Sequence, residues 1–228
     1  MDIKMLEISS LVFFSTAAPL SLLLHKQKKK ILRCMEINKN LRQKAQKVIV
    51  YDDTTMAYNY AYFVRQANRI IIDARKKKDA VSLLVVDIDE LENINIRFGF
   101  RTGDKTLNLV HETTRRSLRA DDIVGRFGGS GFFVLLYGCD AEGVAAVIDK
   151  IKSELGGKRV FGPREESVSF TVKYSSSTAR GRVAQLGKLI ENAEEATHRV
   201  KQEKLFCVVT DHNGHPVLTK KEPVGKTT

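Results

Sequence analysis

Two acidic residues and a glycine-rich hairpin are the parts of this sequence whose types and spacing suggest chemistry. Asp87 and Asp89 follow the continuous apolar run Ala80–Val86, which is typical of a buried strand. Further along, residues 128–131 read Gly-Gly-Ser-Gly between two apolar runs, a pattern that favours a hairpin turn. Carboxylates at strand ends can hold divalent metal ions. The hairpin, however, offers only a hydroxyl, which is a weak ligand for such ions.

A second candidate site is the Arg-x-x-Asp pair formed by Arg119 and Asp122, nine residues before Gly128. A guanidinium offers a planar set of hydrogen-bond donors and a carboxylate offers acceptors, so the pair could bind a polar ligand. Lys150 or Lys152, on the helix expected next, would add a positive charge. The alternative is a surface ion pair at a helix end, which stabilises a protein little.

The elements that must position these residues alternate between helix and strand. Helical patterns are expected over residues 51–78 (after a turn), 87–98, 103–118, 141–155 and 183–201, and strands over 80–86, 123–127, 132–137, 168–174 and 205–210. Asn213-Gly214 then predicts a turn that returns the chain toward Val217-Leu218. This order predicts helices packed around one sheet that contains an antiparallel hairpin.

The motifs together resemble the GGDEF domain, the catalytic module of bacterial diguanylate cyclases. The residues that carry the resemblance are Val85–Asp89, Asn95, Gly99, Gly103, Asp104 and the hairpin Arg126–Leu136, with a weakened first motif of Asp52, Thr55 and Asn59 in which Met56 stands where glycine is usual. The resemblance covers roughly residues 51–209. It implies an α/β fold of the ferredoxin-like palm type, in which helices flank a central, mostly antiparallel sheet, here preceded by an N-terminal hydrophobic helix.

The resemblance also implies that the catalytic chemistry has been lost. Asp87 matches the first metal ligand of the family, but Ser130 and Gly131 stand where the family has two acids. Glu92 falls at a phosphate-contacting lysine, which reverses the charge. Lys201 matches a second phosphate-contacting lysine, but Leu205 replaces the arginine four residues later. We therefore expect a pseudo-enzyme without catalytic residues, metal or cofactor, in which Asp87 is a vestigial ligand.

Two ligand sites remain as hypotheses within the resemblance. Asn95 and Asp104 match the positions that read the guanine base of GTP, although both residue types also serve in turns and helix caps. Arg119 and Asp122 match the family's product-inhibition site, which binds cyclic di-GMP, usually as an intercalated dimer. The resemblance implies that the arginine pairs with guanine O6 and N7 or stacks on the base, and that the aspartate accepts from guanine N1–H and N2–H. Lys150 or Lys152 would add a phosphate or base contact. The second site favours a cyclic di-GMP receptor, and the first leaves a GTP-binding regulatory domain or residual nucleotide hydrolysis as weaker alternatives.

The N-terminal segment has a separate pattern. Residues 8–24 are 17 residues without a charge, interrupted by Pro19, and residues 25–47 follow with nine Lys or Arg against one Glu. This charge order favours a single-pass anchor in the bacterial inner membrane with the domain in the cytoplasm. It disfavours a cleaved signal peptide, and a buried or partner-binding helix is the remaining alternative, with a cytoplasmic protein if residues 8–24 are not inserted.

Heptad-like spacing over residues 31–50 is compatible with a connector helix that pairs with a copy of itself or with a partner protein, and equally with a solvated helix. The expected organisation is thus an anchor at 1–25, a basic connector helix at 26–50, the GGDEF-like domain at 51–210 and a C-terminal tail at 211–228.

Charge and cysteine content disfavour two further classes of protein, those that bind nucleic acid and those that bind a metal through cysteines. The net charge of +11 is concentrated in residues 25–47, so the folded part is only mildly basic, which disfavours a nucleic-acid-binding protein. The three cysteines are scattered and lack metal-binding spacing, which is typical of reduced thiols in a cytosolic domain. The sequence therefore predicts an inactive GGDEF-like receptor for cyclic di-GMP. The alternative is an assembly module of a membrane-associated complex that binds no nucleotide.

Overall fold

The computed structural model describes residues 25–39 and 50–221, and the chain divides into two units, Met1–Val48 and Ile49–Thr228. Residues 25–39 form a helix whose side chains are exposed, among them Ile31 and Met35. Within the described ranges no helix is both long and apolar enough to cross a membrane. Residues 8–24, for which we predict an anchor, lie outside those ranges, and so does part of the predicted heptad pattern.

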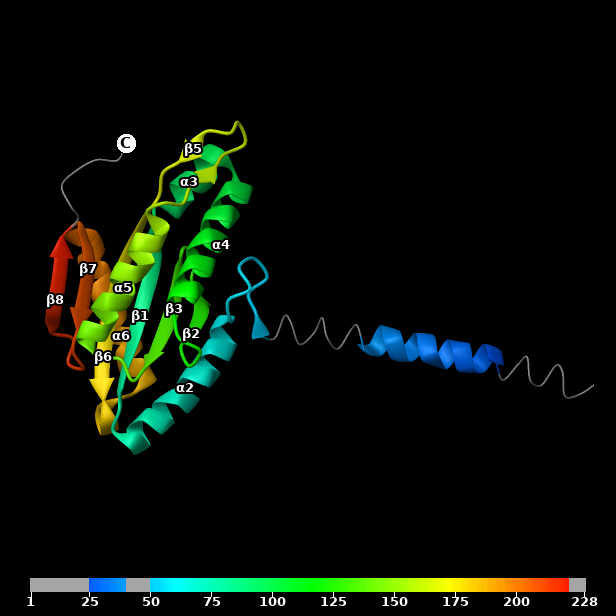
Figure 1. Cartoon of the computed structure of the whole chain (residues 1–228), viewed down its shortest axis with the longest axis horizontal. Coiled ribbons are helices and arrows are strands. Elements are labelled where there is room, and N and C mark those ends of the chain that lie inside the picture. Colours follow the sequence, from blue (N-terminus) through cyan, green and yellow to red (C-terminus); the bar gives the residue numbers. More distant parts are fainter. Residues whose placement is uncertain (1–24, 40–49, 222–228) are drawn as a thin grey trace, which may run out of the picture. The chain divides into compact units, whose positions relative to one another are not determined.

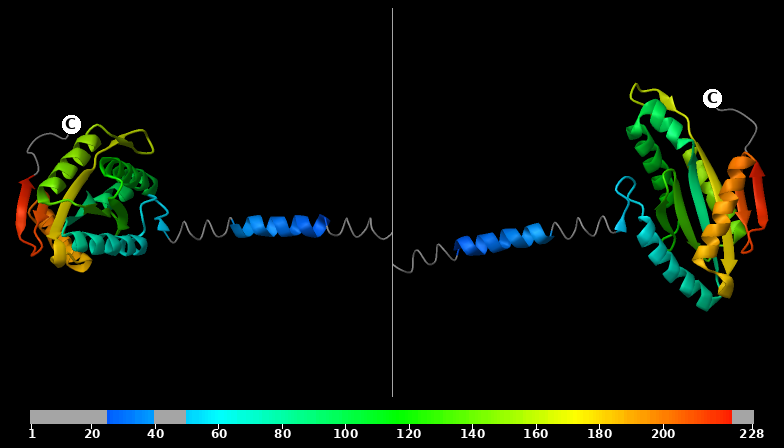
Figure 2. Two further views of the ribbon diagram at one scale, coloured as in Figure 1. Left: turned by 60° about the horizontal axis from the view of Figure 1, so that its bottom comes forward. Right: turned by 180° about the vertical axis from the view of Figure 1, so that it is seen from behind.

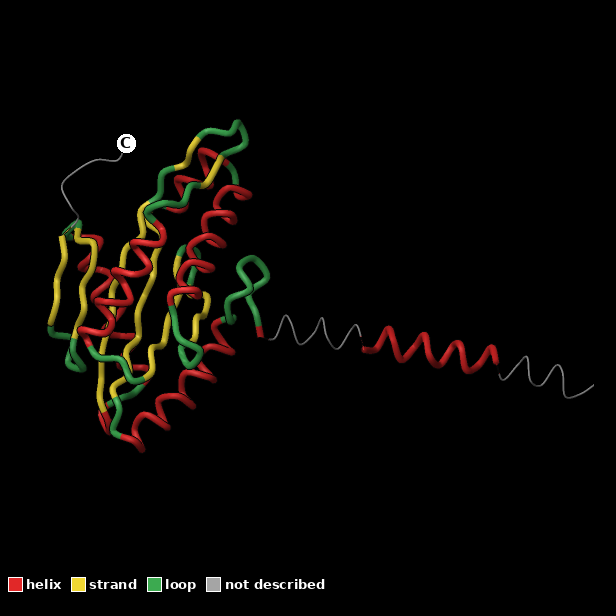
Figure 3. The backbone as a smooth tube through the Cα atoms, in the orientation of Figure 1, coloured by secondary structure: helices red, strands yellow, loops and turns green. Residues whose placement is uncertain are grey.

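Within residues 50–221 the second unit contains one six-stranded sheet, a two-stranded hairpin and five helices of eight or more residues. Figures 1 and 3 show the helices packed around the sheet. The helices are α2 (Tyr60–Lys77), α3 (Leu91–Phe98), α4 (Phe100–Ser117), α5 (Ala141–Leu155) and α6 (Leu186–Gln202), with the short 3-10 turn η1 (Gly181–Val183). The strands are β1 (Ala80–Asp89), β2 (Ile123–Phe127), β3 (Gly131–Tyr137), β4 (Val160–Phe161), β5 (Ser167–Val168), β6 (Thr171–Arg180), β7 (Leu205–Thr210) and β8 (Pro216–Lys221).

The large sheet has the order β2-β3-β1-β6-β7-β8, and β6 with β7 is its one parallel pair. Helices α4 and α5 cover one face, and α2 and α6 cover the other, as the two views of Figure 2 show. Strand β1 lies in the middle and is buried on both sides, because Leu84, Val86 and Ile88 face one cluster while Leu83 and Val85 face the other. The predicted α/β fold with a mostly antiparallel central sheet is confirmed.

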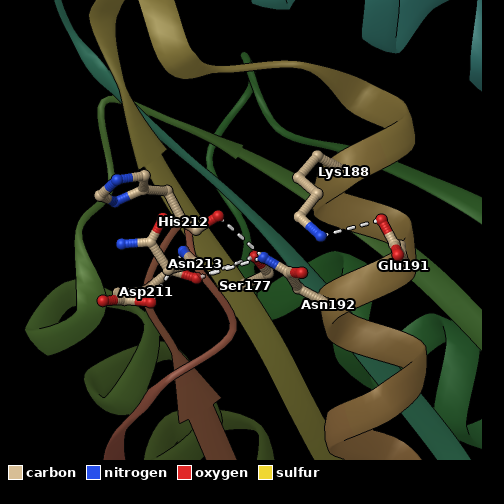
Figure 4. A network of polar contacts seen from close by, with 7 residues as sticks. All are labelled: Ser177, Lys188, Glu191, Asn192, Asp211, His212 and Asn213. Carbon is tan, nitrogen blue, oxygen red and sulfur yellow. Dashed lines mark hydrogen bonds and ion pairs between the residues drawn. The ribbon is translucent and has the colours of Figure 1, made fainter.

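The domain extends beyond residue 210, where we predicted a tail. Strand β8 pairs with β7 through the turn that Asn213-Gly214 predicted. Figure 4 shows how α6 holds this turn: the buried Asn192 donates from Nδ2 to the backbone oxygen of His212 at 3.0 Å. Asp211 Oδ1 accepts from the backbone N–H groups of Asn213 and His215, at 2.8 and 2.9 Å. Residues 211–215 therefore form a turn held by hydrogen bonds, and β8, which follows it, adds the last strand of the sheet.

Three predicted boundaries need correction. Strand β1 runs to Asp89 and helix α3 begins at Leu91, whereas we expected the strand to end at Val86 and the helix to begin at Asp87. Helix α4 begins at Phe100, because Gly99 has a φ of 84° that ends α3 and lets a second helix start at once, whereas we expected the start at Gly103. Strand β6 runs from Thr171 to Arg180, well past the predicted end at Tyr174. Its continuation is the polar run Ser175-Ser176-Ser177, which lacks apolar periodicity although all three residues are buried.

The loop before α2 keeps the weakened first motif in a definite geometry. Asp52 Oδ1 accepts from both the backbone N–H and the hydroxyl of Thr55, at 2.9 and 2.7 Å, and Asn59 caps α2 by accepting from Tyr62 N. Met56 has a φ of 60°, in the left-handed region that glycine adopts most readily. Met56 therefore adopts a backbone conformation that glycine accommodates with less strain than other residues.

His111, on α4, is a partly buried titratable group that links this loop to the sheet. Its ring stacks on Phe132, with centroids 5.6 Å apart and an interplanar angle of 25°. Burial lowers the pKa of His111, an effect opposed by Glu112, by a backbone hydrogen bond with Thr55 and by Asp52, and reinforced by Arg115. The folded domain therefore favours the neutral imidazole.

We expect this histidine to make the domain sensitive to acid. Because the pKa of His111 is lower in the folded state than in the unfolded chain, its contribution to stability is complete above about pH 6.5 and is lost as the pH falls below that value. Melting curves of the parent and of His111→Phe, which keeps a ring against Phe132, test this. The parent should lose stability between about pH 7 and pH 5.5 more steeply than the variant, and equal slopes would contradict the assignment.

Candidate functional site

The predicted metal-binding position lies where β1 meets the glycine-rich hairpin. Asp87 is opposite Gly131 in the β1–β3 register and is 6% exposed. Ser130 Oγ donates to Asp87 Oδ1 at 2.6 Å, and Ile88 N donates to the backbone oxygen of Ser130 at 3.0 Å. The serine that replaces an acid thus turns its hydroxyl toward the one carboxylate that remains.

Two lysines complete the neutralisation of this strand end. Lys201, on α6, places Nζ 2.7 Å from Asp87 Oδ2, and Lys173, on β6, places Nζ 2.6 Å from Asp89 Oδ2. Both carboxylates therefore have an ammonium partner from another element. Lys173 is 11% exposed, so its pair with Asp89 lies mostly out of solvent. We did not predict Lys173, because only the β1–β6 register brings it here.

This donor set does not fit the pair of divalent ions that the family resemblance implies. A metal ion needs free carboxylate oxygens, but Asp87 is bonded to a hydroxyl and an ammonium, and Ser130 and Gly131 supply no acid. A metal ion that bound Asp87 would have to displace the ammonium group of Lys201, which now compensates the charge of this carboxylate. Across residues 25–39 and 50–221, no three His, Cys, Asp or Glu side chains are grouped so as to hold a metal ion.

The positions predicted to read guanine are brought together between α3 and α4. The side chain of Asn95 packs against Gly103, where any added Cβ would overlap its Oδ1 atom. Asp104, the next residue, is exposed. Glycine at 103 is thus required for the close approach of the two helices, and it places the amide of Asn95 beside the backbone that carries Asp104.

Arg126 also belongs to this region, and the sequence analysis did not single it out. Its guanidinium lies over the ring of Phe132 at 5.0 Å and donates to the backbone oxygen of Gly129. Burial lowers the pKa of Arg126, an effect opposed by Asp52 and Asp104. A guanidinium stays protonated in proteins, so the charged group orders the hairpin turn through its contact with Gly129.

The Arg-x-x-Asp pair lies on the wall of a separate cavity of about 340 Å³. The cavity is enclosed by the end of α4, the end of β3 and the first turns of α5, and Arg119, Asp122 and Lys150 all line it. The spacing that singled out these three residues therefore corresponds to one place in the fold. Cys139 also lines the cavity, and burial raises its pKa to about 11, which keeps it a thiol at neutral pH.

The carboxylate of this cavity is held in a fixed orientation. Asp122 is 5% exposed, and its Oδ2 accepts from Arg119 N at 2.9 Å while Oδ1 accepts from Tyr137 N at 3.2 Å. Arg115 Nη1 donates to the backbone oxygens of Arg119 and Asp122, at 3.0 and 3.3 Å, which secures the loop. Each carboxylate oxygen keeps a lone pair for a further donor.

The two basic residues predicted beside this pair lie in different places. Lys150 Nζ donates to the backbone oxygen of Ser117 at 3.2 Å and lines the cavity that also contains Arg119. Lys152 does not line that cavity. Its Nζ lies 4.0 Å above the centre of the Phe206 ring, because two residues along a helix correspond to a turn of about 200°. Of the two alternatives, the structure places only Lys150 at the candidate site.

A family model and two curated relatives all relate this chain to diguanylate cyclases. Residues 49–205 match the family described as diguanylate cyclase, GGDEF domain. Diguanylate cyclase A of Treponema denticola is 27% identical over 141 residues, which are 62% of this chain and 38% of that protein. Probable diguanylate cyclase DgcC of Escherichia coli K12 is 22% identical over 161 residues, 71% of this chain and 43% of that protein. The chain thus spans less than half the length of these two relatives.

A solved structure has the same fold. The crystal structure of the coiled coil and GGDEF domain of DgcB from Caulobacter crescentus, in complex with c-di-GMP, superimposes with a TM-score of 0.69. The match covers 84% of this chain and 98% of that chain at 22% sequence identity.

Proposed function

This chain belongs to the diguanylate cyclase GGDEF domain family, and on that premise we propose that it is a catalytically inactive member that serves as a regulatory receptor for cyclic di-GMP. The observation that carries the proposal is that Arg119, Asp122 and Lys150 line one cavity. The structure of DgcB with c-di-GMP establishes that a protein of this fold accommodates the ligand.

The chemistry of the cavity suits a guanine nucleotide with a bridging phosphate. The exposed Arg119 guanidinium would pair with guanine O6 and N7 or stack on the base. Asp122 would accept from guanine N1–H and N2–H with the lone pairs that its backbone contacts leave free. Lys150 would contact a phosphate. Because Asp122 is already fixed, little of its side-chain freedom remains to be lost on binding.

The proposed loss of catalysis rests on the strand end described above. Joining two GTP molecules requires metal ions that activate a 3′-hydroxyl and neutralise triphosphate charge. Here Asp87 accepts a hydrogen bond from Ser130 and forms an ion pair with Lys201, which compensates its charge within the protein. Retention of Asn95 and Asp104 supports at most GTP binding without turnover.

We further propose that residues 8–24 anchor the chain in the bacterial inner membrane and that the basic helix after them leads to a cytoplasmic domain. The support is the uncharged segment followed by a lysine-rich run, together with the helix over residues 25–39. The exposed Ile31 and Met35 on this helix suit pairing with a second copy or a partner protein, through which binding would be signalled.

A melting experiment separates the receptor from its alternatives. Cyclic di-GMP at about a hundredfold excess over Kd should stabilise the full-length chain by about 2.7 kcal/mol, which corresponds to roughly 5–10 °C in Tm. GTP should give a smaller shift or none. A shift with GTP alone would indicate a GTP-binding regulatory domain, and the absence of any shift would favour an assembly module that binds no nucleotide.

A further inference from the structure

A second cavity of about 330 Å³ lies apart from the Arg119 site. It is enclosed by the C-terminal end of α5, the segment that leads into β6, and β7, and three cationic residues line it: Lys152, Lys158 and Arg159. Because Lys150 and Lys152 project from different sides of α5, the helix separates this cavity from the first one. We refer to it as the basic cavity.

Two of the three cations are positioned by the fold. Lys152 Nζ is centred over the Phe206 ring at 4.0 Å, and Phe206 in turn packs edge-on against Tyr174 with centroids 5.1 Å apart. Lys158 Nζ donates to Thr113 Oγ1 at 2.7 Å, which ties the chain after α5 to α4. Since these ammonium groups are already held in place, a ligand that meets them costs less side-chain entropy.

The charge of the basic cavity is not compensated within the protein. Its lining contains no aspartate or glutamate. Among the residues that the structure describes, none of Lys152, Lys158 and Arg159 forms an ion pair with a carboxylate. This contrasts with Lys173 and Lys201, both of which are paired. Three positive charges around one concave site create a potential that favours an anion.

Hydroxyl groups supply the remaining polar surface. Ser167, Ser169 and Thr171 alternate along the segment before and into β6, and all three are exposed and line the cavity. Ammonium, guanidinium and hydroxyl donors are the groups that bind phosphate oxygens in proteins. The rings beneath them would contact an apolar or planar part of the same ligand.

We propose that the basic cavity binds a small phosphate-bearing molecule, either inorganic polyphosphate-type anions or the phosphate of a nucleotide. This site is independent of the proposed cyclic di-GMP site, and it uses Lys152, which the first site leaves out. Its position against β6 and β7 places a ligand next to the strands that carry Lys173 and support α6.

The test uses the full-length chain with Arg119→Ala, so that the first cavity is disabled and the outcome does not depend on it. Sodium pyrophosphate and AMP are titrated in separate calorimetric experiments, because adenine is not the base expected at Asn95 and Asp104. We expect saturable binding of at least one probe, weakened about tenfold or more when Lys152→Ala and Arg159→Ala are added. The side chains of Lys152 and Arg159 are both exposed, so the two substitutions should leave the fold intact.

Arg69→Ala is the matched control, because it removes an exposed positive charge from α2 on the other face of the sheet. It should leave the affinity unchanged. Binding of pyrophosphate would identify free phosphate chemistry as sufficient, and binding of AMP alone would assign the site to a nucleotide; either supports the proposal. The absence of binding by both probes, or equal affinity with and without Lys152 and Arg159, would overturn it.

Discussion

Replacing Arg119 with alanine is expected to weaken the binding of cyclic di-GMP about 100-fold. The guanidinium would make two charge-assisted hydrogen bonds to one guanine, and losing them should cost about 3 kcal/mol. The side chain is exposed, and the contacts that hold the loop use the backbone of Arg119, so the cavity itself should keep its shape. Equilibrium dialysis with cyclic di-GMP, parent beside variant, measures the effect.

Arg116→Ala is the matched control for this experiment. Arg116 lies near the same end of α4, is also exposed, and forms a surface ion pair with Glu112 at 3.5 Å. Its removal subtracts the same charge and should change the affinity less than about twofold. Arg119→Lys separates the effect of charge from that of bidentate hydrogen bonding, because lysine keeps the positive charge but lacks the planar guanidinium group. Undiminished affinity in Arg119→Ala would exclude this residue from the site.

The second large effect concerns catalysis: the chain should form no cyclic di-GMP from GTP with Mg²⁺ or Mn²⁺. Metal ions contribute several kcal/mol of stabilisation to such a transition state, so their loss should reduce turnover by at least about a thousandfold. The physical cause is the occupation of Asp87 by Ser130 and Lys201, at 2.6 and 2.7 Å. Chromatography of the reaction products provides the measurement.

A variant at the vestigial ligand makes that experiment decisive. If the parent yields a trace of product, Asp87→Asn should yield the same trace, because the product would then come from a contaminating enzyme. Product that the parent forms and Asp87→Asn does not would contradict the assignment of an inactive site. Lys201→Ala should free Asp87 from its ammonium partner without creating activity, since no second carboxylate is added.

Local patterns predicted much of the fold. The apolar run that became β1, the glycine-rich turn between β2 and β3, and the helix Ala141–Leu155 all follow from hydrophobic periodicity and turn residues. Strand β6 was the difficult element, because the hydroxyls of two of its buried serines, Ser175 and Ser177, find partners far along the chain. Ser175 Oγ, for example, donates to the backbone oxygen of Ala193, 18 residues away.

In the candidate site, too, some features follow from local sequence patterns and others depend on contacts between distant segments. The Arg119–Asp122 spacing and a basic residue on the next helix were visible in the sequence, and one cavity collects them. The sequence did not indicate which of Lys150 and Lys152 lines the cavity, because this depends on how α5 is rotated against its neighbours. The pair between Lys173 and Asp89 also depends on non-local register, and no pattern within either segment reveals it.

The central claim is that the chain binds cyclic di-GMP, and a calorimetric titration of cyclic di-GMP into the full-length parent tests it most directly. The account predicts saturable binding with at least one ligand per chain, and two if the ligand binds as an intercalated pair. Absence of heat over a range of temperatures, together with an unchanged Tm, would contradict the receptor and leave the domain as a scaffold.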